Sequence, residues 1–280
     1  MPRADRSCWD EVPQVTALDF DTPNQARLID AFLDGRDNYP ADREVVQRVE
    51  RIAPGIKQLV KDHRAWVGRA LRMLAVQRHM DQFLDLGSGL PTNDNTHQIV
   101  QRHRPDARVV YVDTDPVVLA HGRAVLEEND HTHIVDVDFT DAARAVADPE
   151  ISRRIDFTRP VTVMMTGIIH HILDDAQAHA TVRSWVDAVP SGSYLIFSHQ
   201  LVPADGGERT VLVRDLEAAF AGTKVALVHR ELSTLENYFD GLEMVPPGLV
   251  HLHEWWPDGP RMAPLRPVHW TALGGVARKP

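Results

Sequence analysis

The sequence has little of what marks secreted or membrane proteins. It contains one cysteine, Cys8, so no internal disulfide can form, which fits a reducing compartment. No apolar run approaches the about 20 residues that cross a bilayer. The opening MPRADRSCWDEV lacks the apolar core of a secretion signal. We therefore expect a cytoplasmic protein that has no membrane partner.

Positive charge is also scarce. The chain has 30 Lys and Arg against 40 Asp and Glu, for a formal net charge of −10, and its basic residues are scattered. Extended nucleic-acid sites need clustered Lys and Arg to neutralise phosphates. We expect no nucleic-acid partner, and instead small-molecule chemistry in a monomer or homodimer.

The first 80 residues show helix signals and no strand signal. Residues 1–20 are polar and patternless, which predicts a flexible arm. Residues 21–80 read as a helical cap, in which Thr22 caps a first helix, Pro23 opens it and Gly35 follows its end. Two further helices are predicted over Pro40–Ile52 and 56–79.

From residue 81 to residue 280, short β-rich runs alternate with helical segments, which predicts one α/β domain with a parallel sheet. The runs are Phe83–Leu86, Val109–Val112, Ile134–Val137, Val161–Met165 and Tyr194–Phe197. Helices are then expected at Arg209–Phe220 and, from the capping pattern Ser233…Glu236, at Ser233–Phe239. The tail has strand-like runs at Leu242–Val245, Leu249–Glu254 and Trp270–Ala277, which favour a terminal hairpin with one antiparallel strand.

Two neighbouring predicted strands end in residues suited to a nucleoside. Phe83–Pro91 reads FLDLGSGLP, and Val109–Pro116 reads VVYVDTDP and carries Asp113 at the strand end. Glycines after the first strand let backbone N–H groups approach a ligand, and an acidic residue after the second accepts hydrogen bonds from ribose hydroxyls. This order of elements predicts a nucleoside cofactor.

The details favour S-adenosylmethionine over a dinucleotide. A dinucleotide fingerprint needs a third glycine where Thr92 stands, and a helix immediately after the loop. Here the polar segment Pro91–Asn95 delays the helix to about Thr96. Its Asn and Asp side chains suit the ammonium and carboxylate of an amino-acid tail. An NAD-dependent oxidoreductase remains the less favoured alternative.

The chain resembles a little-characterised branch of the class I S-adenosylmethionine-dependent methyltransferases, once catalogued as a domain of unknown function and later labelled S-adenosyl methyltransferase. The resemblance rests on FLDLGSGLPTNDNTH, VVYVDTDP, PSGSYLIFSH and ARLIDAFLDGRDNYPADRE, and it continues through GLVHLHEWWPDG and GGVARKP. It implies a Rossmann-like α/β fold with a seven-stranded, mostly parallel sheet of order 3-2-1-4-5-7-6, whose seventh strand is antiparallel, and an N-terminal helical cap.

The resemblance also implies residue roles in binding S-adenosylmethionine, with S-adenosylhomocysteine as product. Asp85, Gly87 and Gly89 would surround the methionine moiety. Asp113 would take the ribose hydroxyls and Thr114, with Asp115, would flank the adenosine. Asp138 and Phe139 would contact the adenine. The chain departs from the wider class at Leu90-Pro91, where many members have a further glycine.

The end of the fourth predicted strand is where class I enzymes face the transferable methyl group. Here it reads Met165-Thr166-Gly167 and is followed by His170 and His171. Histidine is suited to general-base catalysis near neutral pH. These two residues are the candidate bases, with His199 next, although a loop histidine is more often structural.

A polar cluster between the first two helices has two interpretations. It comprises Arg27, Asp30, Asp34, Arg36, Asp37, Asn38 and Tyr39. As a lid it would bring Asn38 or Tyr39 to the sulfonium, where the Tyr39 ring would add cation–π attraction. As a plain salt-bridge face it would only stabilise the helices. The branch resemblance favours the lid.

The sequence thus predicts a methyltransferase that acts on a small-molecule acceptor. A non-catalytic sensor of S-adenosylmethionine or S-adenosylhomocysteine is the main alternative and would lack an acceptor cavity. No metal site is predicted, because the His-x-His pairs at His131/His133 and His251/His253 lack the further ligands that a closed site needs.

Overall fold

In the computed structural model, which describes residues 19–261 and 263–280, one eight-stranded sheet organises the chain. Its order is β3-β2-β1-β4-β5-β8-β6, with the short β7 paired to β8. The strands are β1 (Gln82–Leu86), β2 (Arg108–Asp113), β3 (Thr132–Asp136), β4 (Thr162–Thr166), β5 (Tyr194–Gln200), β6 (Glu243–Met244), β7 (Val250–His251) and β8 (Ala272–Arg278). The predicted arm at 1–20 falls outside the described residues, Cys8 included, except for its last two positions.

The predicted sheet order is confirmed. Strands β3, β2, β1, β4 and β5 are parallel, and β8 runs antiparallel between β5 and β6. The expected seventh strand is β8, because the added two-residue strand β7 shifts the numbering by one. β7 is shorter than the predicted Leu249–Glu254 strand, since the chain turns after His251 and buries Trp255 against Trp66, at 6.5 Å between ring centroids.

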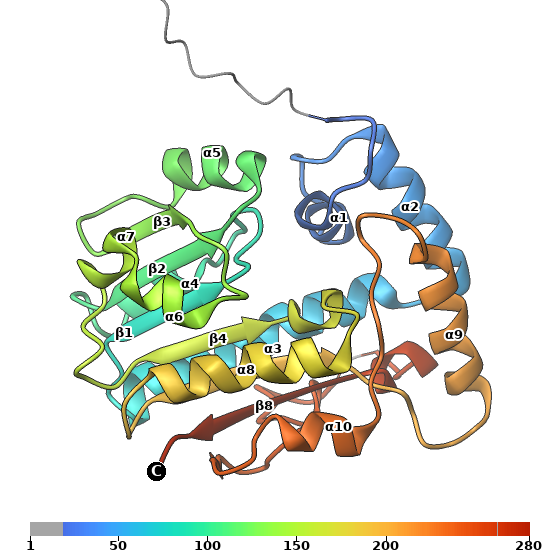
Figure 1. Ribbon diagram of the computed structural model, residues 1–280. Coiled ribbons are helices and arrows are strands. Elements are labelled where there is room, and N and C mark those ends of the chain that lie inside the picture. Colours follow the sequence, from blue (N-terminus) through green and yellow to red (C-terminus); the bar gives the residue numbers. More distant parts are fainter. Residues whose placement is uncertain (1–18, 262) are drawn as a thin grey trace, which may run out of the picture.

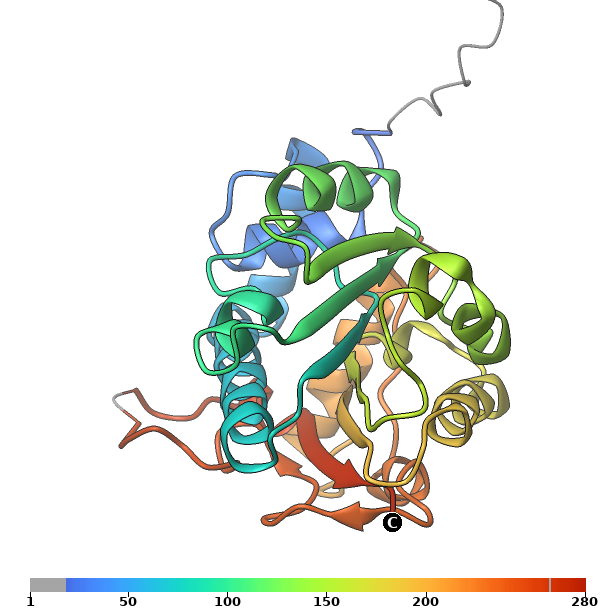
Figure 2. The same cartoon turned by 90° about the vertical axis from the view of Figure 1, so that its left-hand side faces the viewer.

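Helices cover both faces of the sheet (Figure 1). In Figure 2, α3 in cyan and α8 in yellow lie on opposite sides of the strands. The helices are α1 (Gln25–Phe32), α2 (Pro40–Ile52), α3 (Ile56–Gln77), α4 (Thr96–Gln101), α5 (Pro116–Val125), α6 (Ala142–Ala147), α7 (Pro149–Ser152), α8 (Asp175–Ala188), α9 (Glu208–Phe220) and α10 (Leu232–Asn237), with 3-10 turns η1 (Ile169–His171) and η2 (Pro267–Trp270). Within the described part of the chain no helix is long and apolar enough to span a bilayer.

Strict alternation along the strands builds a separate core on each face. On β1, Phe83 joins the core under α3, whereas Leu84 and Leu86 join the core under α8. Successive side chains of a strand point to opposite faces of the sheet. Because helices cover both faces, a continuous run of apolar residues is buried in full. The apolar residues of α1 and α2 share the first core, and a division of the chain into separate domains at residue 80 stays a prediction.

The first helix begins later than its sequence suggested. It begins at Gln25 rather than after Thr22, because the Asn24 side chain accepts the hydrogen bond of the Arg27 backbone N–H and so caps the helix. The Thr22 carbonyl instead accepts a hydrogen bond from the Arg27 guanidinium. That guanidinium is buried and pairs with the buried Asp42 carboxylate on α2 at 3.0 Å.

Gly35 follows the end of α1, as predicted, but it is not the residue that turns the chain. The left-handed residue is Asp34, with φ of 61°. A side chain at position 35 would place its Cβ 1.9 Å from Oδ1 of Asp30, whose carboxylate accepts from the Asp37 backbone and the Asn38 side chain. Glycine is therefore needed here for close approach.

The helix expected at Ser233–Phe239 is α10, which begins at Leu232 after Glu231, so the predicted Ser233 capping box is wrong. Arg230 forms a β-bridge with Leu201, and the next residue, Glu231, is still extended. The helix therefore begins at Leu232, one residue before the predicted start. The predicted helix at Pro40–Ile52 is confirmed at both ends.

Gly274 leaves the space in which Trp66 of α3 packs against β8. A Cβ there would lie 2.6 Å from the Trp66 indole and 2.9 Å from Leu252. Gly274→Ala should lower the free energy of unfolding by about 1–3 kcal/mol through overpacking. Urea unfolding would measure this. Gly259→Ala is the matched control, since its Cβ would meet no atom within 4 Å, and equal stability of the two variants would contradict the packing argument.

Candidate functional site

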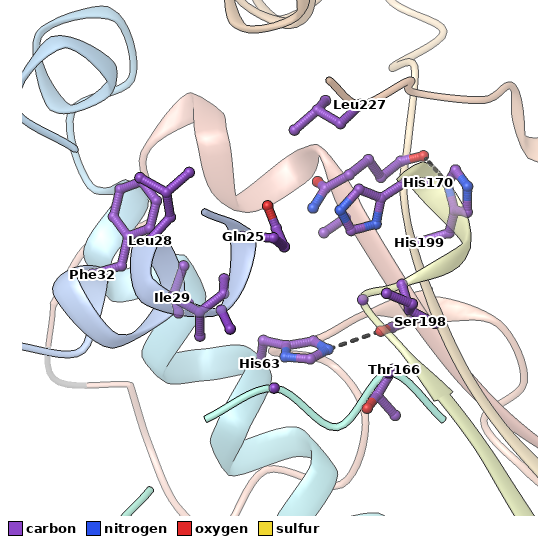
Figure 3. Close-up of a pocket in the computed structure, with 18 of the residues that line it drawn as sticks. Gln25, Leu28, Ile29, Phe32, His63, Thr166, His170, Ser198, His199 and Leu227 are labelled. Carbon is purple, nitrogen blue, oxygen red and sulfur yellow. Dashed lines mark hydrogen bonds between the residues drawn. The ribbon is translucent and has the colours of Figure 1, made fainter. Parts of the chain in front are cut away.

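A cavity of about 320 Å³ lies at the carboxyl ends of the parallel strands (Figure 3). The strand ends and their loops form one side, and α1, α2, α3 and α9 form the other. Of the residues singled out in the sequence, ten line it: Asp85, Gly87, Gly89, Asp113, Thr114, Asp115, Phe139, Thr166, His170 and His199.

Strand alternation explains why polar side chains meet there. In each of four strands, the residue two positions beyond a buried apolar side chain lies on the α3 face at the end of the strand. The pairs are Phe83 and Asp85, Tyr111 and Asp113, Met164 and Thr166, and Ile196 and Ser198. All four polar residues line the cavity.

The glycine turn and Asp113 are in direct contact. Gly87 and Gly89 have positive φ values of 63° and 68°, which favour glycine. The Gly87 N–H donates to the Val112 carbonyl at 2.8 Å, and the Gly89 N–H donates to the Asp113 carboxylate at 2.9 Å. A Cβ at Gly89 would meet no protein atom within 4 Å, so the turn leaves open space for a ligand.

The Asp113 carboxylate is fixed by its own loop. Its Oδ1 accepts from the backbone N–H groups of Thr114 at 2.9 Å and Asp115 at 3.0 Å. The pKa of Asp113 is raised, because the effect of burial exceeds the lowering by these backbone donors. A carboxylate has about four acceptor positions, so this one can still accept from a ligand hydroxyl.

Asp85 lies deeper beside the turn. Burial raises its pKa to about 6, although the Thr96 hydroxyl donates to it at 2.7 Å. Above it, the Arg64 guanidinium donates to the Thr92 hydroxyl at 2.7 Å and to the Asp94 carbonyl at 2.9 Å, and both Arg64 and Thr92 line the cavity. Arg64 is a site residue that sequence reasoning missed.

Helix α1 is joined to the strand ends through two helix caps. Asn24 caps α1 and donates from its side chain to Asp115, whose other oxygen caps α5 through the Val117 and Val118 N–H groups. Asn24 and Asp115 both line the cavity. This contact holds the start of α1 over the carboxyl end of β2.

Four predicted site residues lie away from the cavity lining. Asn38 donates to Asp30 at 2.7 Å, and the Tyr39 ring packs on Phe20 at 4.4 Å between centroids and on the Arg27 guanidinium at 5.2 Å. Asp138 accepts from the Thr140 backbone and hydroxyl in its own turn. The fourth is His171. The polar cluster between α1 and α2 thus contacts mainly the cap itself, as in the salt-bridge interpretation, and Asp37 in addition lies 3.8 Å from His121 on α5.

The three candidate histidines differ in their freedom. His170 lines the cavity, and burial lowers its pKa well below the usual value. His171 contacts the Ala226 carbonyl through Nδ1 at 2.8 Å. His199 is held between the Gln200 carbonyl at 2.7 Å and the Arg230 guanidinium at 2.8 Å, and burial lowers its pKa to about 3. Because Arg230 can only donate, His199 Nε2 accepts and His199 is neutral.

His63 is a further cavity residue that sequence reasoning missed. Its Nε2 contacts the Ser198 hydroxyl at 2.8 Å, and burial lowers its pKa to about 3. The signal was available, because His63 stands four residues after Leu59 and four before Val67, on the apolar stripe of α3. A polar residue on such a stripe faces the interior.

The His-x-His pairs make local contacts. His133 contacts the Asp130 carbonyl, and His251 contacts the Ala272 carbonyl. In the residues that the structure describes, no group of three or more His, Cys, Asp or Glu side chains is placed to hold a metal ion.

The chain is similar to known proteins over almost its whole length. The S-adenosyl methyltransferase family model matches residues 11–280. A crystal structure of a provisionally assigned methyltransferase from Thermobifida fusca YX is 36% identical, with a TM-score of 0.87 over 96% of this chain and 99% of that one. A protein of the DUF574 family from Streptomyces avermitilis is 35% identical, with a TM-score of 0.87 over 93% and 99%.

A more distant similarity concerns the fold alone. An O-methyltransferase family protein from Burkholderia thailandensis is 14% identical, with a TM-score of 0.50 over 76% of this chain and 55% of that one. No curated protein matches the sequence. With its class I sheet order and a family match that covers nearly every residue, the chain belongs to the S-adenosyl methyltransferase family.

Proposed function

We propose that the protein is a methyltransferase that uses S-adenosylmethionine and acts on a small-molecule acceptor. The observation that carries this proposal is the contact between Gly89 and Asp113 at the edge of the cavity. From there the cavity continues past the strand ends to α1, α2 and α9. The donor set fits the cofactor, since it offers a ribose acceptor at Asp113 and an open glycine turn.

The residues on the strand side would hold the cofactor. Asp113 would accept from the ribose, Thr114 and Phe139 would border the adenosine, and Asp85 with the glycine turn would surround the methionine moiety. Arg64 lies at the same end and would balance the methionine carboxylate. Bound S-adenosylmethionine supplies a methyl group on a sulfonium, which is a strong electrophile, and leaves as S-adenosylhomocysteine.

With such an electrophile, the protein mainly has to orient the acceptor. Orientation alone contributes about 7–11 kcal/mol at best. His170 lines the cavity beyond β4 and is neutral because of its burial, so it is available to receive a proton from the acceptor. His171 lies behind it, with its ring centroid 4.2 Å from that of His170.

The extent of the cavity favours an enzyme over a sensor. A pure sensor needs space only for the cofactor, whereas this cavity also reaches apolar side chains of α1, α3 and α9. Turnover of a labelled methyl group with fractions of a metabolite extract would distinguish the two functions.

Asp113→Ala should raise the dissociation constant of S-adenosylhomocysteine at least about tenfold. A hydrogen bond to a charged group contributes about 1.5–3 kcal/mol, and 1.4 kcal/mol corresponds to a factor of ten. Isothermal titration calorimetry would measure it. Asp136→Ala is the control, since Asp136 pairs with Asp113 in register but is exposed and outside the cavity lining. Unchanged affinity in Asp113→Ala would refute the ribose assignment.

The raised pKa of Asp85 predicts proton release when the cofactor product binds. Near pH 6 about half of the Asp85 carboxyls are protonated, and an adjacent ammonium group favours the charged form. Binding of S-adenosylhomocysteine at pH 6 should therefore release about half a proton, and affinity should increase from pH 5 to pH 7. Calorimetry in two buffers of different ionisation enthalpy measures the release. The same release in Asp85→Asn would show that another group supplies the proton.

His170→Ala should reduce methyl turnover about 10²-fold or more if this imidazole accepts the proton. His171→Ala should leave turnover nearly unchanged, because its ring lies outside the cavity lining. Transfer of labelled methyl groups into an active extract fraction is the assay, with product-cofactor affinity measured in parallel. Full turnover in both variants would exclude a histidine base at this strand end.

A further inference from the structure

The cavity divides into a charged half and an uncharged half. Its charged lining residues are Arg64, Asp85, Asp113 and Asp115, all at the ends of β1 and β2 or facing them from α3. Each already has a protein partner through the hydrogen bonds described above. Elsewhere in the lining, among the residues that the structure describes, no Lys, Arg, Asp or Glu occurs.

Three helices supply an apolar wall to the uncharged half. In Figure 3, Leu28, Ile29 and Phe32 lie across the cavity from His170 and Ser198. The wall consists of Leu28, Ile29 and Phe32 on α1, Val60 on α3, and Leu216 and Phe220 on α9. Helix α9 contacts α2 beyond the strand ends, so the part of the wall that α9 supplies lies away from the loops after β1 and β2 (Figure 1).

Facing this wall is a polar end that includes His63, His170 and Ser198. Two further histidines line the cavity and already have partners: His199 contacts Arg230, and His229 contacts Glu217 at 3.1 Å. A Cβ on Gly167, at the end of β4, would lie 3.5 Å from the His63 ring and 4.0 Å from the His170 ring. Both rings therefore converge on the end of β4. Burial lowers the pKa of both imidazoles, so this end offers neutral nitrogens and a hydroxyl.

Such a surface discriminates by charge. An anion would find no unpaired cation here, and a cation would find no carboxylate to replace its lost hydration. Burying an uncompensated charge costs several kcal/mol, whereas a hydroxyl can hydrogen-bond to a neutral imidazole.

We propose that the acceptor is an uncharged, mainly apolar molecule whose hydroxyl group meets His63, His170 and Ser198, with its body against α1, α3 and α9. This inference rests on the proposed function for the word acceptor, but the binding preference belongs to the cavity itself.

The test uses one ring system in three charge states. 2-Naphthol is neutral at pH 7, 2-naphthoate is an anion, and 2-naphthylmethylamine is protonated to a cation. Calorimetric titration of the full chain, with and without saturating S-adenosylhomocysteine, should give a dissociation constant for 2-naphthol at least about tenfold lower than for the other two. Equal or tighter binding of either ion, or no binding of 2-naphthol, would overturn the proposal.

Paired variants on α3 locate the binding site. Val60→Glu places a charge in the wall and should weaken 2-naphthol binding at least about tenfold, while S-adenosylhomocysteine affinity stays unchanged and reports on folding. Val76→Glu is the matched control, since Val76 is 47% exposed on the same helix and outside the lining. Val60→Thr adds only a hydroxyl and should weaken binding less. Undiminished 2-naphthol binding in Val60→Glu, or in Val60→Thr should Val60→Glu not fold, would contradict the placement.

The experiment separates the two proposals. Failure of the wild-type protein to bind S-adenosylhomocysteine would refute the proposed function, while the naphthalene series measured without it would still decide the charge preference. Normal S-adenosylhomocysteine binding with no preference for 2-naphthol would refute only the acceptor class.

Discussion

The hydrogen bond from the Gly89 N–H to the Asp113 carboxylate is the contact on which the site depends. Strands β1 and β2 are parallel neighbours, with Leu86 paired to Val112, so the loop after β1 has to turn over the end of β2. Gly87 and Gly89, which have left-handed backbone conformations, permit that turn, and the Asp113 carboxylate stabilises it by accepting the Gly89 N–H. Arg64 then fixes the next part of the loop through Thr92, and Asn24 joins the first helix to the same edge through Asp115.

The two halves of the cavity follow from the elements that supply them. The parallel strands end at the same edge of the sheet. On the α3 face of each strand, the apolar side chain lies in the core and the next residue on that face, nearer the strand end, is polar. Helices α1, α2 and α9 lie beyond the strand ends and present the same apolar stripes that build their own packing. The charged lining residues thereby lie at the ends of β1 and β2 and on the facing part of α3, whereas most of the apolar lining comes from α1, α2, α3 and α9.

Burial also decides which polar residues remain available. Arg27 pairs with Asp42, which also accepts hydrogen bonds from the backbone N–H groups of the α1 and α2 cap residues. Asp30 accepts from the Asn38 side chain in the turn between these helices. His199 is held by Arg230. His63 is half-buried and His170 buried at the cavity wall, and the lowered pKa of each leaves it neutral there, so the site combines an acidic edge at the ends of β1 and β2 with an uncharged interior.

The residue pattern alone predicted the sheet and the meeting of Gly87, Gly89 and Asp113, because strand period and glycine turns are local properties and parallel strands share an edge. The strand order came from the family resemblance. It also predicted the delayed start of α4 at Thr96. The contacts of Asn38 with Asp30 and of Tyr39 with Phe20 and Arg27, outside the cavity, emerge only from the folded structure, as does the contact of His63 with Ser198, 135 residues away. Such contacts depend on how α1 and α3 pack on the sheet, and packing angles are set by side chains distant in the chain.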